Sequence, residues 1–526
     1  MLPFLGQPKY YSVKKYLLIL CIITGSKIFA QIPEDALRYS WYPQNATARV
    51  MAIGGAMGSL GGDITATFVN PAGLGFYKTG DAVITPGFFL NKVKTNYFSN
   101  STKESKNAFG FGPTGFVIGG PSVYKPKQSV AFSIAATQTA NFNNVIHFKA
   151  LNHLSSFSEQ FAEEFAKSGY TIDEVLNVNS PLPYTSAPAI NTFLIDTVRV
   201  GNTVQVKAAP EFILDAGQAV QQEMFKTTGG GLYEVALGGA INLKEKWLFG
   251  GAIGVPLVSY KSNTTFTETD TSANTNNHFK SFEYNDNFTT KGAGINLKLG
   301  AIFRPVEYFR LGLAVHTPSF MWLADERTVS LKTQLENPAN SFSETSKTFT
   351  NGQPGKSKYI QTAPWKAILS ASYVFREIEN VKKQRAFITA DVEYINHKGS
   401  KFSGNNTDVT TGEKAYYKSL NQVIKDEYKG AFNFKVGGEL KFNTVMGRLG
   451  FAYYTSPYKD AALKANHMLL SGGLGYRNQG FFIDLTYIHN ITKDINFPYR
   501  LEDRQYSYAS IKQQQGNIVA TVGWKF

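Results

Sequence analysis

A strict alternation of apolar and polar side chains runs through most of the chain after residue 80. In the clearest segment, 295–304, Ile295, Leu297 and Leu299 share one face, whereas Asn296 and Lys298 lie on the other. Successive side chains of a β-strand point to opposite sides, so this pattern predicts strands with one apolar and one polar face. The pattern recurs at 308–316, 432–442 and 481–487.

Fourteen segments of this kind are long enough for a tilted strand that crosses a membrane, which needs about 9–11 residues. The predicted strands are 82–98, 110–121, 127–140, 228–243, 246–262, 288–304, 307–320, 363–376, 385–398, 430–443, 445–457, 466–477, 480–491 and 514–526.

The connections between these segments alternate between short and long. Bacterial outer-membrane barrels have an even number of strands, with short turns at one end and long loops at the other. A β-sandwich or a propeller predicts no such alternation. The sequence therefore predicts an all-β fold, a transmembrane antiparallel β-barrel of about 14 strands over 81–526. Its long external connections are expected at about 141–227, 263–287, 321–362, 399–429 and 492–513.

The first 30 residues read as a signal peptide. Lys14 and Lys15 precede an apolar run at 16–24 that is too short to span a bilayer, and a cleavage site is expected near Ala30. A buried N-terminal helix is the alternative. Cys21, the only cysteine, falls in the apolar run, so the mature chain is expected to lack disulfides, thiolate catalysis and cysteine metal sites.

The formal net charge of +14 is spread along the chain, without a run of five basic residues. This distribution favours a solvated surface that faces anionic lipid headgroups of an outer membrane, and no nucleic-acid partner is expected. The chain ends on alternating apolar residues and Phe526, which resembles the C-terminal signal that barrel assembly machinery reads in outer-membrane proteins.

The longest connection, 141–227, has helical character. Phe157, Phe161 and Phe165 recur every four residues, which is typical of one apolar stripe on a helix, and a second helical stretch is predicted at 211–225. Two interpretations remain open. The helices pack on each other and cap the barrel, or they form an external apolar groove that first captures a ligand.

Residues 31–80 do not read as membrane strand. The stretch 49–74 is rich in small residues, and Gly54, Gly55, Gly58, Gly61 and Gly62 permit close backbone approach and positive φ. No Lys-Ser/Thr follows, so this is not a phosphate loop. A compact segment ahead of a barrel is expected to fold back into the lumen as a plug.

The same stretch resembles the N-terminal hatch of the outer-membrane long-chain fatty-acid and toluene transporter family (FadL/TodX type). The residues that carry the resemblance are Gly54-Gly55, Asp63 and Asn70-Pro71-Ala72. The resemblance implies that a hydrophobic ligand is captured by external loops and bound above the hatch. A hatch shift would then release it, in family members through a wall gap at a kink in the third strand.

The family pattern and this chain differ at that kink. The predicted third strand has no Gly or Pro between Val130 and Ala140, whereas Gly254-Val255-Pro256 interrupts the fifth.

Asn70 has two candidate roles, as the cap of a turn and as the anchor of the hatch. Phe68, Val69 and Leu74, together with the three phenylalanines of the 141–227 stretch, are the candidate ligand-binding residues. His316 and His397 are expected in the lumen, either in a bracing hydrogen-bond network or in a catalytic or proton-gated role. The lumen charges expected to pair with each other or with the hatch are Arg310, Asp391, Glu393, Glu439 and Asp484.

The seven histidines show no metal-ligand spacing, and no Gly-x-Ser-x-Gly elbow occurs. We therefore expect no catalytic residue, no metal, no cofactor and no enzymatic activity. The first functional hypothesis is a monomeric outer-membrane channel for hydrophobic small molecules such as long-chain fatty acids. The second is a component of secretion or surface-protein assembly, because some relatives of the family serve type IX secretion. A barrel lipid enzyme is the third.

Overall fold

The computed structural model describes residues 33–121, 128–336, 340–375, 385–405, 410–461, 463 and 465–526. The predicted signal peptide and its cleavage site near Ala30 lie outside these residues. Within them, no helix is long and apolar enough to cross a membrane.

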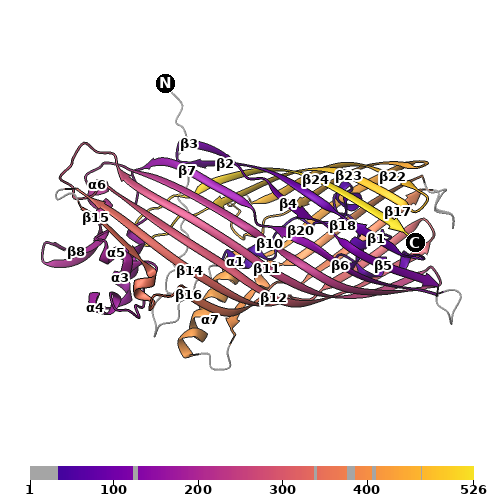
Figure 1. Ribbon diagram of the computed structural model, residues 1–526, viewed down its shortest axis with the longest axis horizontal. Helices are drawn as coiled ribbons and strands as arrows, with labels where there is room; N and C mark the ends of the chain where they lie inside the picture. Colours follow the sequence, from indigo (N-terminus) through magenta and orange to yellow (C-terminus); the bar gives the residue numbers. More distant parts are fainter. Residues whose placement is uncertain are drawn as a thin grey trace, which may run out of the picture.

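The described strands of the large sheet close into one antiparallel barrel, because the last strand pairs with the first (Figure 1). Each segment repeats the alternation that the sequence shows, and the number of barrel strands formed by the described residues is the predicted fourteen. In barrel order these are β1 (Asp81–Ile84) with β2 (Pro86–Tyr97); β3 (Asn100–Ser105) with β4 (Ala108–Phe111) and β5 (Thr114–Pro121); β6 (Gln128–Asn141) with β7 (Asn144–Asn152); β10 (Val220–Leu243); β11 (Trp247–Asp270); β12 (Ser281–Val306); β13 (Phe309–His316) with β14 (Phe320–Leu335); β16 (Gly355–Thr362) with β17 (Lys366–Phe375); β18 (Ala386–Asn396) with β19 (Lys401–Gly404); β20 (Gly430–Phe442); β21 (Val445–Tyr454); β22 (Asn466–Asn478); β23 (Phe481–Asn496); and β24 (Ala509–Lys525).

A band of exposed apolar side chains marks the membrane. On β11 the outward positions from Trp247 to Leu257 carry large apolar side chains or glycine, and from Ser259 onward they are polar. The part of β11 that crosses the apolar band is therefore about 11 residues long, which matches the length of a tilted membrane strand. Aromatic residues border the band at both ends, as in other membrane barrels. They are Trp247, Phe442 and Trp524 at the end with short turns, and Trp322, Trp365 and Phe432 at the other.

Several strands continue far beyond the membrane, and this corrects the predicted loops. The expected long connections at 263–287 and 321–362 are largely occupied by β11, β12, β14 and β16, whereas β23 and β24 take only the two ends of the one at 492–513. The predicted strands stop at the edge of the membrane because the outward residues are polar beyond it. The inward residues of the same strands, such as Phe266 and Phe282, remain apolar and buried.

The predicted helical insertion 141–227 is shorter than expected. β7 occupies its beginning and β10 starts at Val220, so the second predicted helix, 211–225, is wrong in its second half. Phe225 is an outward strand residue opposite His147. The insertion between β7 and β10 contains α3 (Glu159–Ser168), α4 (Ile172–Val175), α5 (Ser186–Asn191), β8 (Ile195–Val200), β9 (Thr203–Ala208) and α6 (Ala209–Asp215).

The insertion covers the external end of the barrel, at the left of Figure 1. It packs on the inward side chains of the extended strands in one large apolar cluster. The remaining external elements are β15 (Asn340–Thr345), η3 (Ser346–Phe349), η5 (His397–Gly399) and α7 (Thr411–Glu427).

Candidate functional site: a filled lumen with two cavities

The N-terminal segment 33–80, called the inner segment below, lies inside the barrel. It contains α1 (Asp35–Arg38), α2 (Ala48–Ala52), η1 (Ile64–Thr67) and η2 (Pro71–Phe76). It touches strands around the barrel, from Ser133 on β6 to Thr521 on β24. Most of its apolar side chains are fully buried.

The wall is shaped to receive this segment by glycines on inward positions. Five of these glycines approach the inner segment closely. A Cβ added at four of them would overlap backbone atoms of the inner segment, and at the fifth, Gly300, it would overlap the side chain of Asn70. Two pairs, Gly250 with Gly300 and Gly437 with Gly450, lie directly opposite each other in neighbouring strands. Glycine within a strand often marks the close approach of another backbone, and here that backbone is the inner segment. The glycines are Gly250, Gly300, Gly312, Gly437 and Gly450.

The glycine-rich loop of the inner segment is held by charged wall residues. Asp391 accepts hydrogen bonds from the backbone N–H groups of Met57 and Gly58, both at 2.9 Å. Arg310 donates to the carbonyl of Leu60 at 2.6 Å. Two of the lumen charges expected to contact the hatch therefore do contact the inner segment.

Gly54 and Gly55 adopt φ of +70° and +78° at the end of α2, which explains why the sequence places glycine there. Asp63 joins two helix starts. Its Oδ1 accepts from the backbone of Thr65 at 2.9 Å, and its Oδ2 accepts from the hydroxyl of Thr47, the N-cap of α2, at 2.8 Å.

Asn70 serves as both a cap and a bridge. Its Oδ1 accepts from the backbone of Ala72 at 3.1 Å and caps η2, with Pro71 at the first helical position. Its Nδ2 donates to the carbonyl of Gly58 at 2.5 Å and lies 3.4 Å from the carbonyl of Ala301 on the wall. The motif residues thus contact different parts of the wall, since Gly54 packs on Phe451 of β21 and Asn70 packs on Gly300 of β12.

A second charged group lies between the wall and α2. Arg448 donates to Glu439 and to Asp484, both at 2.6 Å, and Arg49 of the inner segment lies 3.7 Å from Glu439. Two more of the lumen charges expected to pair, Glu439 and Asp484, therefore do so. Both lumen histidines also contact the inner segment, since His316 Nε2 donates to the carbonyl of Val69 at 2.8 Å and His397 hydrogen-bonds Ser40 at 3.1 Å.

A small cavity of about 100 Å³ lies beside the inner segment. Its walls combine apolar and polar side chains and contain two ion pairs, Lys298 with Glu234 and Lys366 with Glu393, the latter at 3.3 Å. Of the candidate ligand residues in the inner segment, Phe68 lines this cavity. Val69 and Leu74 are fully buried and line neither of the two cavities described here.

A larger cavity of about 780 Å³ lies toward the external end. Tyr42 lines both cavities and lies between them. The larger cavity is rich in aromatic side chains, which include Trp41, Phe142, Tyr260, Tyr428, Tyr458 and Phe497.

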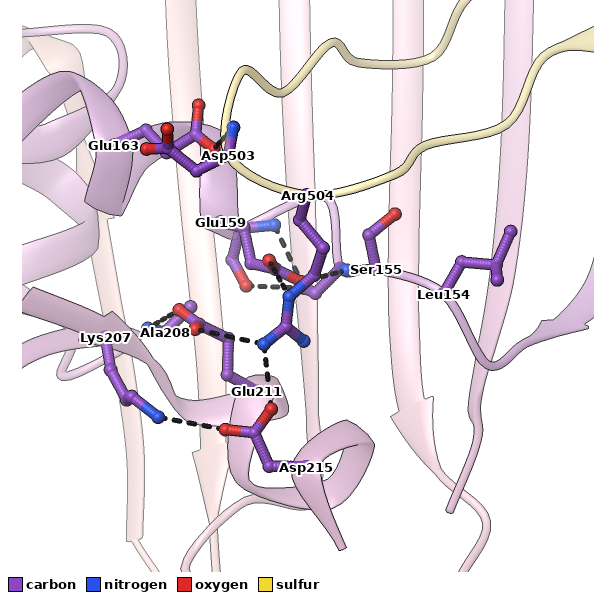
Figure 2. A network of polar contacts seen from close by, with 12 residues as sticks. Leu154, Ser155, Glu159, Glu163, Lys207, Ala208, Glu211, Asp215, Asp503 and Arg504 are labelled. Atoms are coloured by element: carbon purple, nitrogen blue, oxygen red, sulfur yellow. Dashed lines mark hydrogen bonds and ion pairs between the residues drawn. The ribbon is translucent and has the colours of Figure 1, made fainter. Parts of the chain in front are cut away.

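The loop 497–508 between β23 and β24 borders this larger cavity and is tied down at both ends. Arg500 pairs with Glu34 of the inner segment at 2.7 Å. Arg504 pairs with Glu159 at 3.1 Å and with Asp215 at 2.8 Å (Figure 2). The loop therefore links the inner segment to the external helices α3 and α6.

The acidic residues around Arg504 differ in their pKa. Burial raises the pKa of Glu159 to about 8, although the positive charge of the neighbouring Arg504 acts to lower that pKa. Burial also acts on Asp215, but hydrogen bonds from Lys207 and Arg504 hold the pKa of Asp215 below its usual value.

The three phenylalanines of the predicted stripe belong to the external apolar cluster. Phe157 stacks on Phe266 with ring centroids 4.2 Å apart, Phe161 lies 5.5 Å from Tyr284, and Phe165 is buried beside them. These contacts join α3, and Phe157 just before it, to the extended strands β11 and β12. The three side chains line neither of the cavities described above.

The barrel ladder is interrupted beside the small cavity. β4 and β5 are separated by Gly112 and Pro113, and the described residues of β4 pair with β2 and not with β6. In place of ladder bonds, Nδ2 of Asn45 donates to the carbonyls of Phe111 at 3.0 Å and Gln138 at 2.7 Å. The break thus falls in the second strand, while β11 runs through Pro256 without ending.

Sequence reasoning did not single out Asn45 or Tyr42. The predicted strand 110–121 runs through the break, although the Gly112-Pro113 pair is a local signal for it, because proline cannot donate to a ladder and glycine weakens a strand.

Comparison with known proteins places the fold. No family model matches the chain, and no curated protein matches its sequence. Among solved structures, a FadL homologue from Pseudomonas aeruginosa matches with a TM-score of 0.50 and 14% identity, over 91% of this chain and 98% of that chain. The toluene transporter TodX from P. putida matches with a TM-score of 0.50 and 12% identity, over 92% and 99%. The predicted resemblance is confirmed at the level of the fold.

Proposed function

We propose that this protein is a monomeric outer-membrane channel that passes hydrophobic small molecules, and that the inner segment is its hatch. The observation that carries the proposal is the series of two cavities on either side of Tyr42, the smaller of which adjoins the interrupted wall at Asn45. The fold shared with a FadL homologue and a toluene transporter supports it.

The proposed route begins in the large aromatic cavity at the external end. The ligand passes Tyr42 into the small cavity, where Asn45, Thr137 and Thr139 are part of the lining. It leaves between β4 and β6 into the membrane, so that an apolar molecule avoids a passage through water. Asn45 closes this exit, because it bridges the two strands where their ladder is missing.

The small cavity favours an amphiphile over a wholly apolar ligand. Lys298 and Lys366 lie in its wall, each paired with a carboxylate of the protein. A ligand carboxylate can compete for such an ammonium group, whereas a purely apolar ligand leaves the polar wall without compensation. Long-chain fatty acids are therefore the proposed ligands.

The hatch proposal is tested by locking the inner segment to the wall. Ser59 and Ser370 have their hydroxyl oxygens 2.8 Å apart, and so do Thr67 and Ser133 on another side of the barrel. Cysteine pairs at either position are placed to form a disulfide. Cys21 lies in the predicted leader, so the mature variants are expected to carry only the introduced thiols.

We expect each oxidised double variant to take up labelled oleate at least about tenfold more slowly than its reduced form, with single-cysteine variants as controls. Uptake that is unchanged in both oxidised variants would contradict a moving hatch. In cells that lack the gene, normal oleate uptake with retained secreted proteins would instead support a role in secretion.

The proposal includes location and assembly. The leader would be removed near Ala30, and Phe526 would be read by barrel assembly machinery. Phe526 is exposed, and its backbone exchanges hydrogen bonds with Gly80 at 2.8 and 3.0 Å, where the first and last strands meet.

A further inference from the structure

A row of lysines crosses four adjacent strands on the outer face of the barrel. Lys94 on β2 lies directly opposite Lys103 on β3 and Lys512 on β24. Lys512 in turn lies opposite Lys493 on β23. All four side chains are exposed, and Lys92 lies two residues from Lys94 on the same face. These strands form the upper side of the barrel in Figure 1.

This arrangement is unfavourable for the protein alone. Side chains directly opposite in neighbouring strands have Cβ atoms about 4.5–5.5 Å apart, and like charges in such positions destabilise a sheet. In the described part of the chain, none of the five lysines pairs with a carboxylate. The other outward residues beside the row are uncharged: Asn96, Ser101, Ser105, Ser510 and Gln514.

The height of the row identifies its surroundings. Lys92 is two residues beyond Leu90, which is an exposed apolar residue of β2. Farther along β24 and β23, the outward positions are Ile518, Val522 and Tyr487, all lipid-facing. The lysines therefore stand just outside the apolar band, on the side of the external loops, where the headgroups of the outer leaflet lie.

We propose that this row binds the phosphate groups of an anionic lipid in the outer leaflet. Neighbouring strands are about 4.8 Å apart, so the four ammonium groups follow a line about 15 Å long, which suits a headgroup with two separate phosphates. Basic clusters beside a membrane attract anionic headgroups, and each lysine adds to the binding. The lipid supplies the negative charge that the strands lack.

The test uses the full-length purified protein in detergent and in phosphatidylcholine nanodiscs, with bisphosphorylated lipid A as the probe. The variant is Lys94→Gln with Lys512→Gln. The matched control is Lys261→Gln with Lys291→Gln, since these exposed lysines on β11 and β12 lie opposite Thr289 and Ser259 rather than other lysines.

We expect the row variant to bind lipid A at least about tenfold more weakly, and the control variant to bind within twofold of the unchanged protein. Without lipid, the row variant should melt at the same temperature or higher, because it has lost repulsion. Inorganic phosphate at millimolar concentration should not displace the lipid.

Lipid A binding that is equal in the row variant and the unchanged protein would overturn the proposal. Displacement by inorganic phosphate alone would also overturn it, since the site would then recognise a free anion. Neither readout depends on transport. Failure of the lipid-binding proposal would therefore leave the channel proposal intact, and failure of the channel proposal would leave the lipid-binding proposal intact.

Discussion

Asn70 makes two kinds of contact that a substitution can separate. Asn70→Asp keeps the oxygen that caps η2 but loses the donor to the carbonyl of Gly58, whereas Asn70→Ala loses both. The cap alone contributes about 1 kcal/mol. If the bridge holds the hatch, both variants should show frequent channel openings in planar bilayers. If the cap alone matters, Asn70→Asp should remain as closed as the unchanged protein.

Glu159 predicts a pH dependence of the external cap. Burial raises its folded-state pKa from 4.5 to about 8, so the unfolded segment loses its proton first as the pH rises. Its contribution to cap stability is therefore complete below about pH 4.5, falls as the pH rises toward 8, and then stays level. The other charges around it are Arg504, Glu211 and Glu268.

Amide hydrogen exchange of α3, corrected for intrinsic rates, should accordingly speed up severalfold between pH 6 and pH 9. Glu159→Gln should remove that change, because its side chain does not titrate. The same pH profile in both proteins would show that Glu159 is not the group responsible.

At this scale the sequence indicated some residues and not others. Gly54, Asp63 and Asn70 were visible because glycine clusters and Asx-type caps have strong local conformational preferences. Asn45 and Tyr42 had no such signal, since the role of Asn45 depends on residues 66 and 93 positions away in the chain and that of Tyr42 on the shape of a cavity. Phe157 was visible as apolar, but the partner that buries it, Phe266, lies in a stretch that the pattern assigned to a loop.

The loop 497–508 is the element whose attachment is easiest to weaken. Arg504→Ala removes its pairs with Glu159 and Asp215, each worth about 0–1 kcal/mol because Arg504 is partly exposed. We expect tryptic cleavage after Arg500 to speed up by severalfold at low salt and by less at high salt. Lys332→Ala, an exposed external site on β14, is the control and should leave the cleavage rate unchanged.

Elements were predictable where one rule governed a whole strand. Fourteen strands followed from period-two alternation, because lipid on one side and a polar lumen on the other impose it within the membrane. Beyond the membrane the outward side chains of β11 are polar and its inward side chains include buried apolar ones such as Phe266, which is the opposite of the pattern within the membrane. This part of the strand was therefore predicted as a loop. The second half of the helix predicted at 211–225 is a strand instead. From Val220 onward this stretch pairs with both β7 and β11, and those pairings outweigh its helical pattern.

At the scale of the whole molecule, the barrel and its inner segment form separate sets of bonds. The ladder closes from β24 to β1 and β2, and Gly80 is the first described residue that bonds backbone to backbone with the end of the chain. The inner segment is held instead by wall side chains such as Asp391, Arg310 and His316, and by contacts with inward glycines. Closure of the wall therefore does not require the segment that fills it.

Deletion of residues 33–79 should consequently leave a folded but open barrel. Asp391 and Arg310 would lose their partners in the inner segment, yet water would enter the lumen and solvate them, so they would not remain as buried unpaired groups. We expect the deletion variant to keep the faster gel migration of an unboiled barrel, to melt several degrees lower, and to conduct ions in planar bilayers far more than the full chain. Glycine-to-valine substitution at Gly300 is a useful companion, because it pushes on Asn70 without removing the segment and should give partial conductance. A deletion variant that never attains the unboiled barrel form, even when refolded in detergent, would mean that the inner segment is a folding core around which the wall assembles.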